Sequence, residues 1–275
     1  MDFELSVDQG ALQSAALSLL DDQCPTTRVR QVADETGHLD DTLWAAMAEQ
    51  GWLAVELPEA DGGLGLGLVE TAVLCEQLGR HVAPVPFLGT VLTALALTWA
   101  VADEEAEATA ALGEVGVGTW IEQLSAGDAV GAVSWSRRPG AVTAQSDGRR
   151  RWTLSGRSDL VVYGPSADVV IVFAEADGSP ALFALAPEGA ERPSAEPAMD
   201  RTRSVGWLDF ADRPALRLGG PDRAADLLDR AATAMSAEML GAADRVLEMT
   251  VAYAKDRVQF GRPIGGFQAV KHRSP

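Results

Sequence analysis

Cysteine and histidine are scarce in this chain of 275 residues. The two cysteines, Cys24 and Cys75, are too few for a disulfide framework and do not have a paired metal-ligand spacing. The three histidines are scattered along the sequence, which argues against a zinc site. We therefore predict that the protein holds no metal and works in a reducing compartment, the cytoplasm.

Basic residues are also few, because 22 lysines and arginines stand against 40 acidic residues, for a formal net charge of -18. A chain without a basic stripe cannot release counterions from nucleic acid or an anionic membrane, so neither is an expected partner. The N-terminus lacks the basic and apolar regions of a signal peptide. The longest apolar stretch, residues 87–102, is interrupted by glycine and threonine and is short for a membrane span, so we expect none.

The residues that are present are typical of a globular protein with a real core. Apolar residues make up 47% and charged residues 23%, and the length suits two or three modest domains. Apolar residues at helical spacing dominate residues 1–125, with one face in residues 12–20 and another in residues 43–52. We expect this part to be an all-helical domain.

Residues 126–218 have a different pattern, in which short β-rich runs alternate with Gly, Pro, Asp and Ser. Several short strands at this spacing predict a β-barrel or sandwich. The runs are residues 132–135, 152–154, 160–163, 169–173, 181–185 and 205–210.

From residue 219 onward we expect a C-terminal helical domain that opens with one long helix. Pro221 suits its first turn, and Gly261 with Pro263 ends it. Apolar residues at three- and four-residue steps predict a single apolar stripe. The stripe comprises Leu228, Ala232, Met235, Met239, Ala242, Val246, Met249 and Tyr253. The predicted fold class is therefore α+β and multidomain, with an N-terminal helical bundle, a middle β-barrel or sandwich and an incomplete C-terminal helical domain.

At the end of the long helix a guanidinium and two amides accompany two aromatic rings. These are Arg257, Gln259 and Gln268, with Phe260 and Phe267. Such donors at a helix end suit a phosphate or the edge of a heterocycle. Residue chemistry alone favours a plainer interpretation, in which the arginine complements the helix dipole and the rings pack a helical hairpin. Both interpretations stay open.

The string from Tyr253 to His272 resembles the signature of the acyl-CoA dehydrogenase family, Tyr-x-x-x-Arg-x-Gln-Phe-Gly-x-Pro-Ile-x-x-Phe-Gln before a Lys-His pair. A second stretch agrees, since Pro-Glu-x-x-Gly-Gly-x-Gly at residues 58–65 and Glu-x-Leu-Gly-Arg at residues 76–80 resemble the family's N-terminal domain in the same order. By itself the glycine-rich loop is a packing turn, because it matches neither the P-loop nor the dinucleotide fingerprint.

The resemblance implies FAD as the cofactor, in a site shared between subunits. Position by position, it implies cofactor contacts for Arg257, Gln259, Phe267 and Gln268, with Phe260 close by. It also implies α,β-dehydrogenation of an acyl-CoA thioester, in which a carboxylate takes the α-proton and the flavin accepts the β-hydride. Electron-transfer flavoprotein is the implied electron acceptor, and a homo- or hetero-oligomer is the implied assembly.

The middle region departs from the family at both of its flavin motifs. Residues 134–140 replace Thr-Glu-Pro and Gly-Ser-Asp, while residues 160–162, Leu-Val-Val, replace Trp-Ile-Thr. Tyr163 can substitute for the missing ring, although a tyrosine at a strand end more often only packs. We assign no cofactor contact in this region. The family's Asp-x-Thr-Arg segment is matched at residues 200–203.

The base that the reaction needs cannot be assigned. Most of the family carries it in a later part of the C-terminal domain, and this chain stops at Pro275. A minority carries it on the long helix, at a position that is Ala231 here. Glu238 and Glu248 lie off the apolar stripe, and we interpret them as solvated or salt-bridged. Truncation, pairing with a catalytic partner and an unrecognised carboxylate all stay open.

These observations predict an FAD-dependent acyl-CoA dehydrogenase. The alternatives are a non-catalytic, FAD-sharing subunit of a heteromeric enzyme or an inactive truncated copy, and a third option is a flavin oxygenase or oxidase on the same fold. The predicted domains are residues 1–125, 126–218 and 219–275, and no catalytic residue is assigned.

Overall fold

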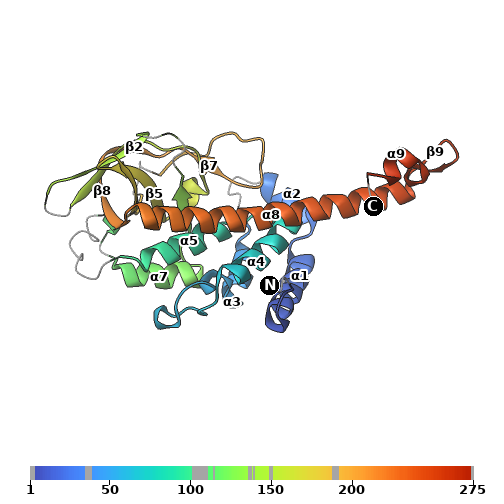
Figure 1. The fold of residues 1–275 in the computed structure, drawn as a ribbon, viewed down its shortest axis with the longest axis horizontal. Helices are drawn as coiled ribbons and strands as arrows, with labels where there is room; N and C mark the ends of the chain where they lie inside the picture. Colours follow the sequence, from blue (N-terminus) through green and yellow to red (C-terminus); the bar gives the residue numbers. More distant parts are fainter. Residues whose placement is uncertain are drawn as a thin grey trace.

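The computed structural model describes residues 4–34, 39–100, 111–113, 115–135, 138, 140–148, 151–187 and 192–273. The first part of the chain is helical (Figure 1). Its helices are α1 (Val7–Gln23), α2 (Thr26–Asp34), α3 (Asp41–Glu49), α4 (Leu68–His81), α5 (Phe87–Leu97) and α7 (Val117–Ala126), with the 3-10 turns η1 (Trp52–Ala54) and η2 (Glu59–Asp61) between α3 and α4.

Polar side chains fix where these helices begin and how they meet. Ser6 and Gln9 form a reciprocal capping box at the start of α1, and the Gln9 amide also donates to Glu70 on α4 at 2.8 Å. Asp40 caps α3 while Arg28 of α2 donates to its carboxylate at 2.7 Å. Two caps of the helical region are therefore also contacts between helices.

The middle of the chain forms a closed barrel. Its strands are β1 (Gly131–Ser134), β2 (Val142–Ser146), β3 (Trp152–Arg157), β5 (Val169–Ala176), β6 (Ser179–Leu185) and β8 (Asp209–Gly219). Their order is β1-β5-β2-β3-β8-β6, and β6 pairs again with β5, which closes the ring. The short strands β4 (Val161–Val162) and β7 (Val205–Gly206) pair with each other, and the turn η3 (Gly164–Ser166) follows β4.

Strand β5 is buried on both faces, because successive side chains on a strand point to opposite sides. Val170 and Val172 lie in the barrel core, whereas Val169 and Ile171 belong to the core shared with the helices. The near-continuous apolar run at residues 169–173 follows from this double burial. The predicted barrel is confirmed, but the sequence analysis missed β2 and most of β8, because the run at residues 205–210 covers β7 and only the first two residues of β8.

Helix α5 covers the outer edge of β1 with two threonine side chains. The Gly131 amide donates to the hydroxyl of Thr90 at 3.1 Å, and the Thr93 hydroxyl donates to the carbonyl of Ala132 at 3.2 Å. Both threonines are fully buried. The polar residues that interrupt this apolar helix therefore satisfy the backbone of a strand edge.

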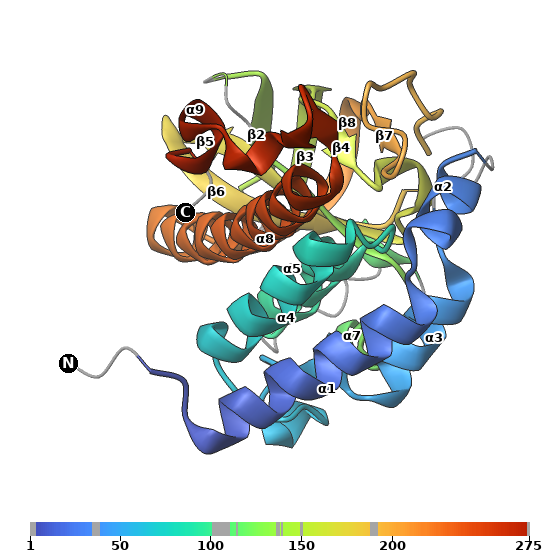
Figure 2. The ribbon, with the colours of Figure 1, turned by 90° about the vertical axis from the view of Figure 1, so that its right-hand side faces the viewer.

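The long helix α8 (Pro221–Asp256) connects all parts of the molecule. It lies between the barrel and the N-terminal helices, and its C-terminal end extends beyond the body of the molecule (Figures 1 and 2). A short hairpin of β9 (Val258–Gln259) and β10 (Arg262–Pro263), the turn η5 (Ile264–Gly266) and α9 (Gln268–Lys271) follow it. The predicted α+β fold class, with its long C-terminal helix, is confirmed.

The apolar stripe predicted for this helix is not the face that the chain buries. The buried positions are Ala224, Leu227, Ala231, Ala234, Gly241 and Ala254, mostly one residue earlier in the helical repeat. Met239, Val246, Met249 and Tyr253 of the predicted stripe are 56–66% exposed. Small residues, not the large ones of the stripe, face α4. The helix thus carries a second apolar face that the described chain leaves uncovered.

Backbone packs directly on backbone where α4 crosses α8. A Cβ atom added to Gly241 would lie 1.8 Å from the carbonyl oxygen of Glu76, and one added to Gly79 would lie 1.9 Å from that of Glu238. Arg80 fastens the next turn, since it pairs with Asp244 at 2.8 Å and with Glu248 at 2.5 Å. The two glycines therefore set the distance between these helices.

Among the described helices, none has both the length and the apolar character needed to cross a membrane.

We expect Gly241→Ala to lower the free energy of unfolding by about 2 kcal/mol or more, because the added methyl group forces α4 and α8 apart. Urea unfolding followed by circular dichroism measures this change. Gly10→Ala is the matched control, since Gly10 lies in α1 with nothing within 4 Å of the added methyl group. That substitution should be neutral or stabilising by about 0.5–1 kcal/mol. Equal urea midpoints for Gly241→Ala and the parent would contradict the backbone contact.

Candidate functional site

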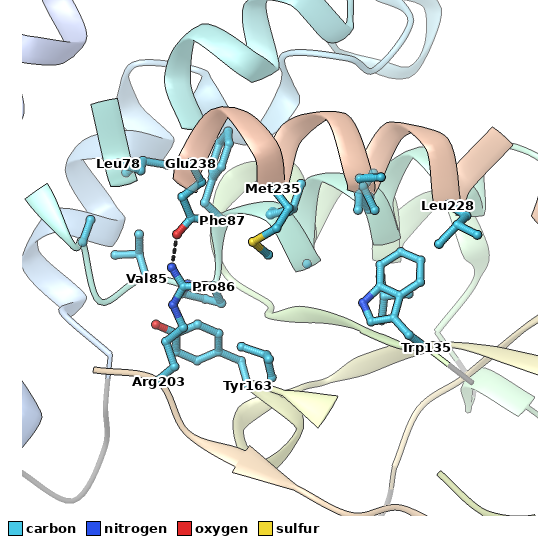
Figure 3. Close-up of a pocket in the computed structure, with 18 residues that line it drawn as sticks. Leu78, Val85, Pro86, Phe87, Trp135, Tyr163, Arg203, Leu228, Met235 and Glu238 are labelled. Carbon is cyan, nitrogen blue, oxygen red and sulfur yellow. Dashed lines mark hydrogen bonds and ion pairs between the residues drawn. The ribbon is translucent and has the colours of Figure 1, made fainter. Parts of the chain in front are cut away.

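A cavity of about 320 Å³ lies between α8, the start of α5 and the mouth of the barrel (Figure 3). This volume falls within the range of small-molecule sites. Its lining residues are Leu78, Ala83, Val85, Pro86, Phe87, Leu88, Gly89, Leu92, Val133, Trp135, Val162, Tyr163, Arg203, Leu228, Ala231, Ala232, Met235 and Glu238. Nearly all of them are apolar, so the cavity suits a hydrophobic group.

Each wall of the cavity comes from a different part of the fold. Trp135 follows β1 and packs on Phe173 of β5, with ring centroids 5.0 Å apart. Met235 projects from α8 toward the centre, and Trp135 lies with Leu228 at one end (Figure 3). Small side chains at Ala231 and Ala232 leave the space open along α8.

The other end of the cavity holds an ion pair. Arg203, which precedes β7, donates to the carboxylate of Glu238 on α8 (Figure 3). The side chains are only 25% and 14% exposed, so both charges are partly removed from water. Arg203 and Glu238 are the only charged residues among the described residues that line the cavity. The prediction that Glu238 and Glu248 are salt-bridged is confirmed, since Glu248 pairs with Arg80 and Arg245.

Tyr163 holds its ring against this polar end in an uncommon backbone conformation. Its φ is 56°, in the left-handed region that non-glycine residues rarely adopt. The residue is buried, and its hydroxyl donates to the carbonyl of Thr202 at 3.3 Å. Burial raises the pKa of the Tyr163 phenol well above its usual range. Local strain of this kind is kept only where surrounding contacts fix it, and it is frequent at binding sites.

The position that was considered for a catalytic base holds no acid. Ala231 lines the cavity with its methyl group. Among the described lining residues, Glu238 is the sole carboxylate, and it is engaged with Arg203. At about 1.5 Å per residue, the seven residues from Ala231 to Glu238 place the carboxylate roughly 10 Å further along α8. The described lining of the cavity therefore offers no free carboxylate at or near residue 231.

The five predicted cofactor residues lie together at the far end of α8. We call residues 257–273 the C-terminal arm. Arg257, Gln259, Phe260 and Gln268 are exposed on it, and Phe267 is half-buried. The 18 residues of helix between Glu238 and Asp256 correspond to roughly 27 Å. None of the five lines the cavity in the described structure, and their cofactor contacts stay a prediction.

Aromatic and backbone contacts give the arm a defined shape. Phe260 is 93% exposed, has φ at 51°, and meets the edge of Phe267 at a centroid distance of 6.3 Å. The guanidinium of Arg262 lies 4.0 Å from the centroid of Phe267. The amide of Ile264 donates to the carbonyl of Arg257 at 2.8 Å. The arm is thus a short β-hairpin followed by a single helical turn, in which Phe260 stays exposed and the side chains of Arg257 and Gln268 are exposed as well.

The divergent middle motifs lie partly at the cavity. Val162 lines it, whereas Leu160 is 43% exposed and Val161 is buried. Ser136, Arg137 and Pro139 of the other motif lie outside the described residues, as does Pro275. The described part of the chain contains no cluster of three His, Cys, Asp or Glu side chains that could hold a metal ion.

The sequence analysis missed the cavity and the ion pair at its end. Arg203 belongs to the matched Asp-x-Thr-Arg segment, but nothing in its spacing indicates Glu238 as its partner. Trp135 was considered only as part of a divergent motif. Tyr163 was interpreted as packing or as a replacement ring, and it does reach the cavity.

Comparisons with known proteins match both ends of the chain to the same family. The family model described as "Acyl-CoA dehydrogenase, N-terminal domain" matches residues 6–109, and "Acyl-CoA dehydrogenase, C-terminal domain" matches residues 219–274. The chain is 33% identical to acyl-CoA dehydrogenase IpdE2 of Mycolicibacterium smegmatis, over 98% of this chain and 71% of the relative. It is 32% identical to acyl-CoA dehydrogenase FadE27 of Mycobacterium tuberculosis, over 99% and 72%.

A solved structure has a similar fold. The crystal structure of the ChsE4-ChsE5 complex from Mycobacterium tuberculosis matches with a TM-score of 0.86 and 31% identity. The match covers 99% of this chain and 73% of that one.

We expect the stability cost of Tyr163→Phe to shrink at alkaline pH. Because the pKa of buried Tyr163 is raised, its contribution to stability is fully present below about pH 10, the ordinary value of an unfolded tyrosine, and is lost as pH rises above it. Urea unfolding of the parent and the variant between pH 7 and 11 measures the difference. Tyr253→Phe, at an exposed position on α8, should change stability by less than about 0.5 kcal/mol throughout. A pH-independent cost for Tyr163→Phe would contradict the buried phenol.

Proposed function

Because the chain belongs to the acyl-CoA dehydrogenase family, we propose that it is one subunit of a heteromeric enzyme and contributes its C-terminal arm to FAD held largely by a partner subunit. The resemblance noted in the sequence is confirmed, and so is the enzyme class, an oxidoreductase acting on CH–CH bonds. The cofactor, the assembly, the roles of the arm residues and the domain limits at residues 125 and 218 belong to the proposal.

The observation that carries the proposal is the position of the arm. Arg257, Gln259 and Gln268 are exposed on a segment that stands away from the chain's own cavity (Figure 1). A guanidinium and amides suit a pyrophosphate or a heterocycle edge. An exposed ring such as Phe260 gains free energy when another surface covers it. These features fit a cofactor site completed by a second chain.

The uncovered face of α8 supports an assembly. Large apolar side chains follow the helix toward the arm: Met239, Leu240, Val246, Leu247, Met249 and Tyr253, each at least 43% exposed. A contiguous apolar surface of this kind is typical of a protein interface. The similarity to the ChsE4-ChsE5 complex favours a partner of a different sequence.

The composition of the cavity supports a site in which this chain binds the acyl group and another subunit supplies the base. Its apolar walls suit an acyl group, but Ala231 offers no base and Glu238 is held by Arg203. An acyl-CoA dehydrogenase needs a carboxylate that takes the α-proton, while bound FAD supplies the acceptor for the β-hydride. We infer that the carboxylate comes from the partner, which would also supply the flavin that takes the β-hydride at this cavity.

Within this proposal the chain's own residues bind and exclude water. The side chains of Phe87, Leu92 and Met235 surround the acyl group, and Arg257 with the two amides holds the partner's cofactor. Electron-transfer flavoprotein, the acceptor that the family implies, would take up the electrons. The second candidate is an enzyme that acts alone, which the presence of Glu238 in the cavity favours.

Arg257→Ala should weaken FAD retention about tenfold or more, because a charge-assisted hydrogen bond to the cofactor is lost. The protein is loaded with FAD, alone and with a candidate partner subunit, and flavin absorbance is measured after gel filtration. Arg151→Ala is the matched control, since it removes the same charge from an exposed position on the barrel. Equal flavin retention by Arg257→Ala and Arg151→Ala would assign the arginine to helix capping. Protein that stays colourless with and without partner would exclude the cofactor.

Acyl-CoA should bleach the flavin only when the partner subunit is present, because this chain lacks a free base in the described cavity. Anaerobic mixing of octanoyl-CoA with FAD-loaded protein, with and without partner, measures the reaction. Bleaching by this chain alone would favour the second candidate. In that case Glu238→Gln should slow the bleaching by at least about 100-fold, the usual contribution of a general base.

A further inference from the structure

The Arg203–Glu238 ion pair is the only polar feature with charge in an otherwise apolar cavity of the described structure. Partial burial of two charges costs desolvation free energy, and such pairs contribute little to stability compared with packed hydrophobic residues. The fold does not need the pair to hold α8, which is already fastened to α4 by the two glycines and by Arg80. A role toward a ligand explains its position better.

The pair keeps unused hydrogen-bonding capacity. A guanidinium has five N–H donors and a carboxylate has two acceptor oxygens. Among the described residues, the side-chain hydrogen bond of Arg203 goes to one oxygen of Glu238. Neither side chain contains a fully buried polar atom without a partner, and both residues line the cavity, so we infer that the remaining donors and the second oxygen are open to a ligand there. The Tyr163 hydroxyl is occupied by Thr202 and does not compete.

We propose that the Arg203–Glu238 pair makes this cavity select acyl groups that carry a neutral oxygen, a hydroxyl or keto group, at the end remote from the thioester. This inference rests on the proposed acyl-binding role of the cavity. With the reacting carbons beside Ala231, the pair lies roughly 10 Å further along α8, at the end closed by the α4–α5 connection. The distance corresponds to the far end of a medium-length or cyclic acyl group.

The charge of the pair decides which oxygen is accepted. A hydroxyl can accept from Arg203 and donate to Glu238, and a keto oxygen can accept from Arg203. The methyl end of an unsubstituted acyl chain would displace the water that hydrogen-bonds to these donors and this acceptor. Because a methyl group forms no hydrogen bonds in its place, this costs free energy. A carboxylate would meet an arginine that Glu238 already neutralises, and it would be repelled by Glu238. The preferred order is therefore hydroxyl first, then methyl and carboxylate.

Three CoA thioesters of one chain length test this order: 8-hydroxyoctanoyl-CoA, octanoyl-CoA and the mono-CoA thioester of octanedioic acid. Isothermal titration calorimetry gives their dissociation constants for the purified chain and for its complex with the partner. We expect the hydroxyl thioester to bind about tenfold more tightly than each of the others, as for a hydrogen bond to a charged group.

Glu238→Gln should invert the discrimination between hydroxyl and carboxylate. The amide keeps the size of the side chain and leaves the charge of Arg203 uncompensated, so the carboxylate thioester should then bind more tightly than the hydroxyl thioester. Glu248→Gln is the matched control, because it removes a carboxylate from an ion pair on the same helix but outside the cavity. It should keep the parent's order. Thermal unfolding verifies that both variants are folded, and the parent's own ranking tests the inference without any variant.

The outcomes separate this inference from the proposed function. Binding of all three thioesters with equal affinity, or tightest binding of octanoyl-CoA, would overturn the selection by Arg203 and Glu238 and leave the acyl-binding role intact. Failure of all three to bind, in the chain and in the complex, would overturn the acyl-binding role together with the inference. An unchanged order in Glu238→Gln would show that the pair does not contact the ligand.

Discussion

The contact between α4 and α8 is made by backbone atoms, and much of the molecule depends on it. Gly79 and Gly241 let the two helices approach until the carbonyls of Glu76 and Glu238 fill the space that side chains would otherwise take. This contact fixes α8 in the middle of its length. Toward the N-terminal end the helix then forms one wall of the cavity, and toward the C-terminal end it carries the arm away from the body (Figure 1).

The cavity and the predicted cofactor-binding residues of the arm lie in different parts of the chain. In the cavity, apolar side chains surround the space beside Ala231, and the one carboxylate among the described lining residues is bound to Arg203. On the arm, a guanidinium and amides are exposed, and none of them lines this cavity in the described structure. Roughly 27 Å of helix separates these parts, so one copy of the chain does not bring them together. The proposal of a shared site follows from this separation.

Much of the fold could be predicted because its signals are local. The barrel strands follow from β-rich runs between turn residues, and α8 follows from Pro221, Gly261 and the regular spacing between them. The face that α8 buries could not be predicted, because hydrophobicity marks two faces and only the partner decides which one is covered. Ala234 and Gly241 are inconspicuous in the sequence, yet they are buried where Met239 and Val246 are exposed.

The candidate site was predictable only where it forms one continuous motif. The arm residues are close in sequence, so their shared chemistry can be recognised, whereas Arg203 and Glu238 are separated by 35 residues and meet only through the fold. The same holds for Tyr163, whose left-handed backbone has no signal in its neighbours. Long-range pairs of this kind require the tertiary structure.

Thr90 and Thr93 of α5 limit how the protein can associate with other chains. A strand with a bare edge is a template for pairing with strands of other molecules. Thr90 and Thr93 occupy the amide of Gly131 and the carbonyl of Ala132, and closure of the ring pairs the remaining strands of the sheet with one another. The β-region is thereby protected against edge-to-edge aggregation, while the apolar face of α8 stays available. Contacts with other chains are directed to a helix, where side chains rather than backbone groups determine which partner is accepted.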